Sequence, residues 1–189
     1  MNKMIRTFIC IELPASLKTR LETLEIELQK QTSTRVSWVK PTNIHLTLRF
    51  LGDIAEDQVP KIKSCVERAC LEVKSFTLTA SQLGAFPSLQ RPRVFWVGIK
   101  DPTNTLLIMQ KKIEQELIAS GFGKADHPFS PHLTIGRVKE GNGQDITAKL
   151  NQIEFVPETL SVKEAIVMRS DLKPTGAVYS KIALINLVE

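Results

Sequence analysis

A four-residue phrase occurs twice in this sequence, and its repetition constrains the fold more than any other feature. His-Leu-Thr-Leu begins at His45 and His-Leu-Thr-Ile at His132, an interval of 87 positions (132 − 45). Identical residues keep that interval at Arg6/Arg93, Phe8/Phe95, Pro41/Pro128, His45/His132, Leu46/Leu133 and Thr47/Thr134. This register predicts a duplicated chain whose halves fold alike and associate with pseudo-twofold symmetry.

The residues around the two phrases predict matching secondary structure. Residues 15–30 and 103–120 carry leucine and isoleucine at spacings of three and four, which is typical of amphipathic helices. Further helical segments are expected at 56–73 and 146–152, and strands at 75–86, 93–100, 158–172 and 177–189, the last two as a hairpin. We therefore expect an α+β fold of two pseudo-symmetric lobes, each an antiparallel-rich sheet with outer helices, around a central cleft. Residues 1–189 would form one bilobal domain.

Both phrases alternate polar and apolar residues, as half-buried strands do. In such a strand His45 and Thr47 share one face, and His132 and Thr134 share the corresponding face of theirs. Symmetry would then set the two histidines opposite each other across the cleft, as halves of one site.

Two histidines and two threonines predict acid–base chemistry on a phosphate. Near neutral pH one imidazole can be protonated and the other neutral, so the pair can supply an acid and a base for an in-line displacement. The threonine hydroxyls can donate hydrogen bonds to phosphate oxygens. Zinc is disfavoured because neither phrase contains a carboxylate or thiolate, and the sequence has neither a G-x-S-x-G motif nor a glycine-rich phosphate loop.

Neighbouring residues extend the predicted site. Arg49 shares the parity of His45 and Thr47, whereas Arg137 reaches the same face as His132 only if Gly136 allows a bulge. His127 has no repeat partner and is interpreted as structural. Candidates to stack on a base are the aromatic residues Phe8, Trp38, Phe95 and Trp96, although core packing is the alternative for most of them.

Composition adds weaker expectations. The net charge of +5 favours an anionic partner slightly. Apolar runs are strand-sized rather than membrane-spanning, and the first residues do not read as a secretory signal. The three cysteines, Cys10, Cys65 and Cys70, fit no metal or redox spacing and are interpreted as reduced core residues of a cytoplasmic protein.

The segments "FICIELP", "SWVKPTNIHLTLRFLG" and "FSPHLTIGRV" resemble the two-histidine phosphoesterase superfamily. Within it they are similar to the RNA 2',3'-cyclic phosphodiesterases, first described as 2'-5' RNA ligases. The resemblance covers nearly the whole chain. One departure is Ser37 before Trp38, where many relatives have a basic residue, and it affects only a peripheral RNA contact.

The resemblance implies an enzyme without metal or other cofactor that opens 2',3'-cyclic phosphate ends of RNA to 2'-phosphomonoesters. It implies His45 as the proton donor to the departing 3'-oxygen and His132 as the proton acceptor that activates water. Thr47 and Thr134 would hold non-bridging oxygens, and Arg137 would add positive charge. The expected partner is RNA with cyclic phosphate ends, tRNA fragments among them, bound by a monomer with no membrane association.

Two alternatives stay open from the sequence. The same groups can catalyse the reverse reaction, as a 2'-5' RNA ligase that joins tRNA halves. A non-catalytic protein could instead use the histidines to bind an RNA end, although such a protein would not need both of them.

Overall fold

The computed structural model describes residues 3–30, 32–174 and 176–189, and these form two antiparallel sheets. The first sheet has the strand order β3-β1-β8-β9, with β1 (Met4–Glu12), β3 (His45–Ala55), β8 (Glu164–Lys173) and β9 (Gly176–Asn186). The second has the order β2-β6-β5-β4-β7, with β2 (Arg35–Trp38), β4 (Phe76–Phe86), β5 (Val94–Lys100), β6 (His132–Glu140) and β7 (Glu158–Val162). The predicted fold class is confirmed.

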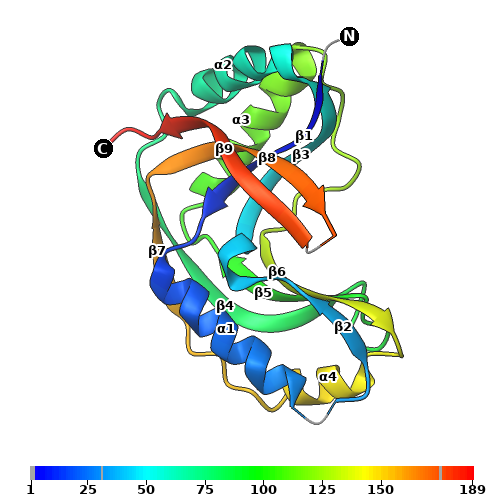
Figure 1. The fold of residues 1–189 in the computed structure, drawn as a ribbon. Coiled ribbons are helices and arrows are strands. Elements are labelled where there is room, and N and C mark those ends of the chain that lie inside the picture. Colours follow the sequence, from blue (N-terminus) through cyan, green and yellow to red (C-terminus); the bar gives the residue numbers. More distant parts are fainter. Residues whose placement is uncertain (1–2, 31, 175) are drawn as a thin grey trace.

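Helices cover the outer face of each sheet, as Figure 1 shows. The first sheet carries α2 (Val59–Cys70) and α3 (Thr105–Ala119), and the second carries α1 (Ala15–Gln29) and α4 (Gln144–Leu150). Short 3₁₀ turns, Pro41–Asn43 and Glu56–Gln58, precede β3 and α2. Among the described residues, no helix is both long and apolar enough to cross a membrane.

The chain crosses between the lobes within each half. It leaves the first sheet after β1, forms α1 over the second sheet, and returns to the first sheet as β3. The second half mirrors this path: β5 and β6 belong to the second sheet, while α3, between them, packs against α2 on the first. Each lobe is therefore covered by a helix that the other half of the chain supplies.

The expected strand over 158–172 is wrong in one respect. The chain changes sheets at Lys163, because β7 pairs with β4 in the second sheet and β8 pairs with β1 in the first. The hairpin of the last two strands is confirmed, since β8 and β9 pair antiparallel along their length.

The register of β1 and β5 corrects part of the repeat. The residues opposite the two histidines are Glu12 for His45 and Gly98 for His132, an interval of 86 (98 − 12) rather than 87. A slip of one residue moves a strand's side chains to the other face. The predicted equivalence of Phe8 and Phe95 is therefore wrong, because the two side chains lie on different faces of their sheets. Phe8 joins a small cluster on the histidine face, whereas Phe95 belongs to the main core under the helices.

Candidate active site

The same local interaction orients both histidines. The Nδ1 atom of His45 lies 2.8 Å from the carbonyl oxygen of Asn43, and Nδ1 of His132 lies 2.7 Å from that of Ser130. Because a carbonyl oxygen only accepts hydrogen bonds, we assign the proton of each neutral ring to Nδ1. That assignment leaves Nε2 of both rings as the atom that can take up or release a proton.

A bulge in β3 decides which side chains follow Thr47 on the histidine face. The β1–β3 register shifts by one at Leu48, so alternation reverses beyond it. The parity prediction for Arg49 is therefore wrong, because this side chain turns toward α3. Arg49 nevertheless borders the cavity that Thr47 and His132 line. Its Nε lies 2.8 Å from the Oε2 of Glu114 as an ion pair, and its Nη atoms donate to the carbonyls of Phe50 and Gly123. Phe50 takes the place on the histidine face, in contact with Phe8.

A matching bulge in β6 has the opposite consequence for its arginine. The β5–β6 register shifts at Ile135, which turns Gly136 to the helix-covered face and Arg137 to the face of His132. The sequence placed Arg137 on the face of His132 only if the strand bulges near Gly136, and this bulge is present. Burial lowers the pKa of His132 and raises that of Tyr179, and the charge of Arg137 lowers the pKa of both. The positive charge of Arg137 therefore influences a side chain on each sheet, His132 on the second and Tyr179 on the first.

Aromatic rings enclose His45. Phe8 is stacked on the imidazole with ring centroids 4.5 Å apart, and Tyr179 of β9 meets it edge-on at 5.3 Å. Phe8 is 1% exposed, so its ring packs against the imidazole and Phe50 instead of lying open to a base. Sequence reasoning missed Tyr179, because β9 has no counterpart in the repeat.

The surroundings of His132 are different. Phe86 of β4 meets its ring edge-on at 5.0 Å. Trp96 is the strand partner of Thr134, and its indole covers Gly84 so closely that a Cβ there would lie 2.3 Å from the ring. Glycine at position 84 is what allows this ring to lie flat on the sheet.

Trp38 lies away from the histidine face. It pairs with Gly136 and its ring stacks on Phe95, with centroids 6.4 Å apart, on the side that the helices cover. The neighbouring residue Ser37 pairs with Arg137 instead. The position of Trp38 is that of a core residue, and its predicted contact with substrate gains no support.

Burial lowers the pKa of both catalytic candidates. For His45 burial is the largest influence, followed by the opposing hydrogen bond to Asn43 and then by the charges of Lys18 and Glu12, which act in opposite directions. For His132 burial is again the largest. Neutral imidazole is thus favoured at both positions in the free protein.

Residues of the two lobes line a common cavity of about 200 Å³. Thr47 from β3 and His132 from β6 both border it, together with the segment that leads from α3 into β6. His127 lies in that segment and borders the cavity too, although it is exposed. His45 and Tyr179 border a second cavity, of about 280 Å³, next to the start of α1. The arrangement of all four groups around one phosphate stays a prediction.

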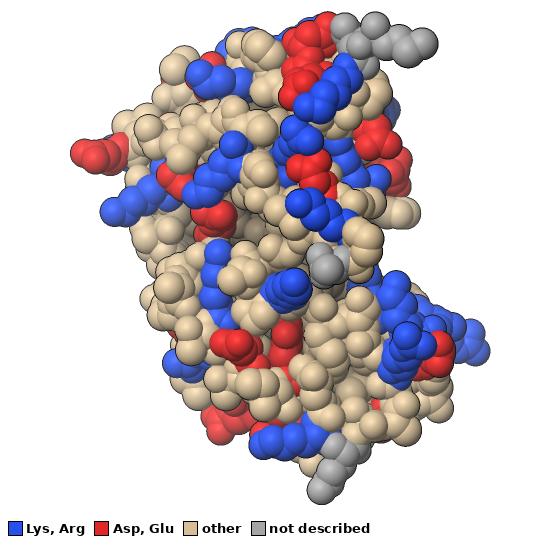
Figure 2. Space-filling view, in the orientation of Figure 1, with Lys and Arg blue, Asp and Glu red and all other residues tan. Residues whose placement is uncertain are grey.

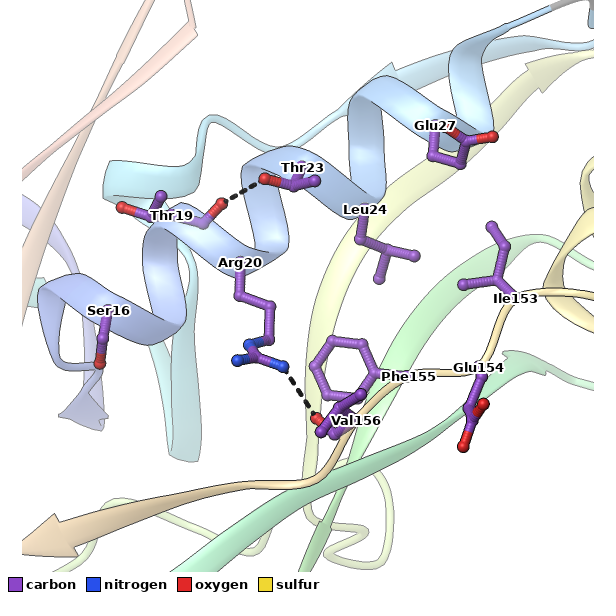
Figure 3. Close-up of a pocket in the computed structure, with 10 residues that line it drawn as sticks. All are labelled: Ser16, Thr19, Arg20, Thr23, Leu24, Glu27, Ile153, Glu154, Phe155 and Val156. Atoms are coloured by element: carbon purple, nitrogen blue, oxygen red, sulfur yellow. Dashed lines mark hydrogen bonds between the residues drawn. The ribbon is translucent and has the colours of Figure 1, made fainter.

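A larger groove, of about 520 Å³, lies outside this region between α1 and residues 153–156 (Figure 3). Arg20 spans it, donating to the carbonyl of Val156 and pairing with Glu158 at 2.7 Å. The described residues that line it include no histidine, cysteine or tyrosine. It offers no acid–base pair comparable to the two histidines.

The cysteines and acidic residues form no metal site within the ranges that the structure describes, where no group of three or more His, Cys, Asp or Glu side chains could hold an ion. Cys10, Cys65 and Cys70 are buried free thiols. Burial raises the pKa of Cys10 to about 12, so this thiol beside Thr47 stays protonated and unreactive.

Comparison with known proteins identifies the family. The family described as "LigT like Phosphoesterase" matches residues 11–96 and again residues 97–179, so each match contains one His-Leu-Thr phrase. The chain belongs to this phosphoesterase family. A protein from Thermotoga maritima, named RNA 2',3'-cyclic phosphodiesterase, is 34% identical over 93% of this chain and 91% of its own. One of the same name from Methanothermobacter thermautotrophicus is 29% identical over 97% of this chain and 99% of its own.

Solved structures of other proteins share the fold. Escherichia coli LigT, crystallised with 3'-AMP, superposes with a TM-score of 0.78 at 23% identity, covering 99% of this chain and 100% of its own. The protein TT0787 of Thermus thermophilus gives the same TM-score, also at 23% identity, over 97% of this chain and 98% of its own. At this identity the likeness establishes the fold alone.

Proposed function

We propose that this phosphoesterase hydrolyses the 2',3'-cyclic phosphate ends of RNA to 2'-phosphomonoesters, with two histidines and no metal. The observation that carries the proposal is the equal setting of His45 and His132, each with Nδ1 bound to a carbonyl and Nε2 left for proton transfer. The names of the Thermotoga and Methanothermobacter relatives support the substrate class.

The proposed step is a single in-line displacement. Nε2 of His132 takes a proton from water, whose oxygen attacks phosphorus, and the bond from phosphorus to the 3'-oxygen breaks. Protonated His45 gives its proton to that oxygen, which leaves a 3'-hydroxyl and a 2'-phosphomonoester. Thr47 and Thr134 donate to the non-bridging oxygens, and Arg137 stabilises their negative charge. Proton exchange with solvent restores both rings.

The structure suggests roles for the flanking aromatic residues in this step. Phe8 and Tyr179 fix the plane of the His45 ring and shield it from water, and Phe86 supports His132. Such shielding keeps the imidazoles neutral until a phosphate anion arrives, whose negative charge then favours protonation of one of them.

The test is incubation with an oligoribonucleotide that ends in a 2',3'-cyclic phosphate, in the presence of EDTA. We expect turnover, and ³¹P NMR of the product should show the phosphate on the 2'-oxygen. A 3'-phosphate product, or loss of activity on chelation that added metal restores, would contradict the mechanism. Binding without turnover would favour an RNA-end binding protein, and joining of tRNA halves under these conditions would favour ligation.

A further inference from the structure

The cavity beside His45 carries charges that the proposed reaction step does not use. Besides His45 and Tyr179, it is bordered by Glu12 of β1, Lys18 of α1 and Lys181 of β9. Figure 2 shows this side of the molecule hollowed between the two lobes, near the start of α1, with basic side chains on both sides of the hollow. We call this cavity the Lys18 pocket.

Only part of the positive charge in the Lys18 pocket is neutralised. Lys181 pairs with Glu12, with Nζ and Oε2 2.5 Å apart, and this hydrogen bond raises the pKa of Lys181. Lys18 is half-buried and forms no salt bridge with any residue of the described ranges. The ammonium group of Lys18 is therefore available to an anion, and the pocket has a net charge of about +1 from these three side chains.

The other lobe does not repeat this pocket. Glu12 is the strand partner of His45, but the partner of His132 is Gly98, and the ring of Trp96 lies against that glycine. The position 87 residues beyond Lys18 is Thr105, which begins α3. The proposed acid–base step needs two histidines, but it does not need this one-sided charge. The asymmetry indicates a role in recognition of one side of the substrate.

We propose that the Lys18 pocket binds the 5'-phosphate of the nucleotide whose cyclic phosphate is opened, which in RNA is the last internucleotide phosphodiester. This inference rests on the proposed function. If His45 protonates the 3'-oxygen, the ribose must lie on the His45 side of phosphorus, and its 5' substituent then extends toward the pocket beside that ring. Lys18 is the main contact, and Lys181 is held by Glu12 as a second donor. The site thereby favours the end of an RNA chain over a free cyclic nucleoside phosphate.

The experiment compares kcat/KM for two substrates, adenosine 2',3'-cyclic phosphate and the dinucleotide ApA with a 2',3'-cyclic phosphate end. We expect the wild-type enzyme to prefer the dinucleotide. Lys18→Gln should lower kcat/KM for the dinucleotide about tenfold, as expected for loss of one charge-assisted hydrogen bond, and leave that for the nucleoside substrate within about twofold. The slope of log kcat/KM against log salt should become shallower by about 0.7 for the dinucleotide, the value for one phosphate contact on a single strand.

The matched control is Lys111→Gln, which removes an exposed lysine of α3 on the other side of the first sheet and should change neither substrate. Equal loss for both substrates in Lys18→Gln, or no loss for either, overturns the pocket assignment while leaving hydrolysis intact. Product binding tests the pocket without turnover. By calorimetry, adenosine 2',5'-bisphosphate should bind the wild type more tightly than adenosine 2'-phosphate, and Lys18→Gln should abolish the difference. If neither cyclic substrate is hydrolysed, the proposed function fails, and equal binding of the two products overturns the pocket as well.

Discussion

The two histidine strands have nearly the same backbone and different surroundings. In both, the ring is anchored through Nδ1 to a carbonyl two residues earlier, and a bulge follows the threonine. His45, however, is enclosed by Phe8 and Tyr179, whereas His132 has Phe86 at its edge and the charge of Arg137 nearby. Repetition of a backbone thus gives two imidazoles with the same hydrogen bond, and the residues around them distinguish the two.

The largest expected effect tests whether His45 is the proton donor and His132 the proton acceptor. His45→Ala and His132→Ala should each lower kcat/KM for a cyclic phosphate end by ~10²–10⁴-fold, the usual contribution of general acid–base catalysis. With a p-nitrophenyl phosphodiester, whose leaving group needs no proton, His45→Ala should regain most of its loss and His132→Ala should not. Equal losses on that substrate would remove the distinction between acid and base.

The next comparison is between Arg49 and Arg137, the arginines that follow the bulges in β3 and β6. Arg49→Gln should lower the free energy of unfolding by about 3–5 kcal/mol, because it leaves Glu114 without its buried ion-pair partner. Urea unfolding measures the loss, and kcat/KM per folded molecule should remain close to wild type. Were kcat/KM to fall sharply in a fully folded variant, Arg49 would belong to the substrate site after all.

Arg137→Gln should show the reverse pattern. The side chain is exposed, so unfolding should change little, while kcat/KM should fall about 10–100-fold through loss of charge-assisted contacts to the phosphate. Phe50→Leu, at the corresponding position after the other bulge, is the matched control and should reduce kcat/KM less than threefold. Similar losses in both variants would contradict a specific role for the guanidinium.

The smallest effect is a shift of the pH profile. The proposed mechanism needs one protonated and one neutral histidine, and burial lowers the pKa of both below the usual value of about 6.5. The bell-shaped profile of kcat/KM, which reports the free enzyme, should therefore peak below pH 6.5. Tyr179→Leu should move the profile toward higher pH, because it opens His45 to water. An unchanged profile would mean that burial by Tyr179 does not lower the pKa of His45.

Stability should follow the same titrations. A histidine whose pKa is lowered by folding takes up protons more readily in the unfolded chain. Its contribution to stability is therefore present above about pH 6.5 and is lost as pH falls from there through the lowered pKa of the folded protein.

The sequence predicted much of this arrangement because periodicity and repetition are local signals. The α+β class, α1, α3 and the shared face of each His-Thr pair all follow from alternation and spacing. The predictions that proved wrong depend on insertions or deletions of a single residue within a strand pair. The bulge at Leu48 sends Arg49 to the helices, and the shortened interval between β1 and β5 separates Phe8 from Phe95. Tyr179 could not be placed, because its contact with His45 depends on how β9 pairs at the sheet edge.

The duplication itself remains our proposal, supported by the double family match and by the two equivalent bulges. Its structural consequence follows from the exchange of α1 and α3 between the lobes. If either half were produced alone, each sheet would lack the strands that the other half supplies, and α1 or α3 would lose packing partners, so we expect neither fragment to fold. The crossing of α1 and α3 between the lobes also ties the two sheets together. We therefore expect the distance between the two imidazoles to be fixed once the chain has folded.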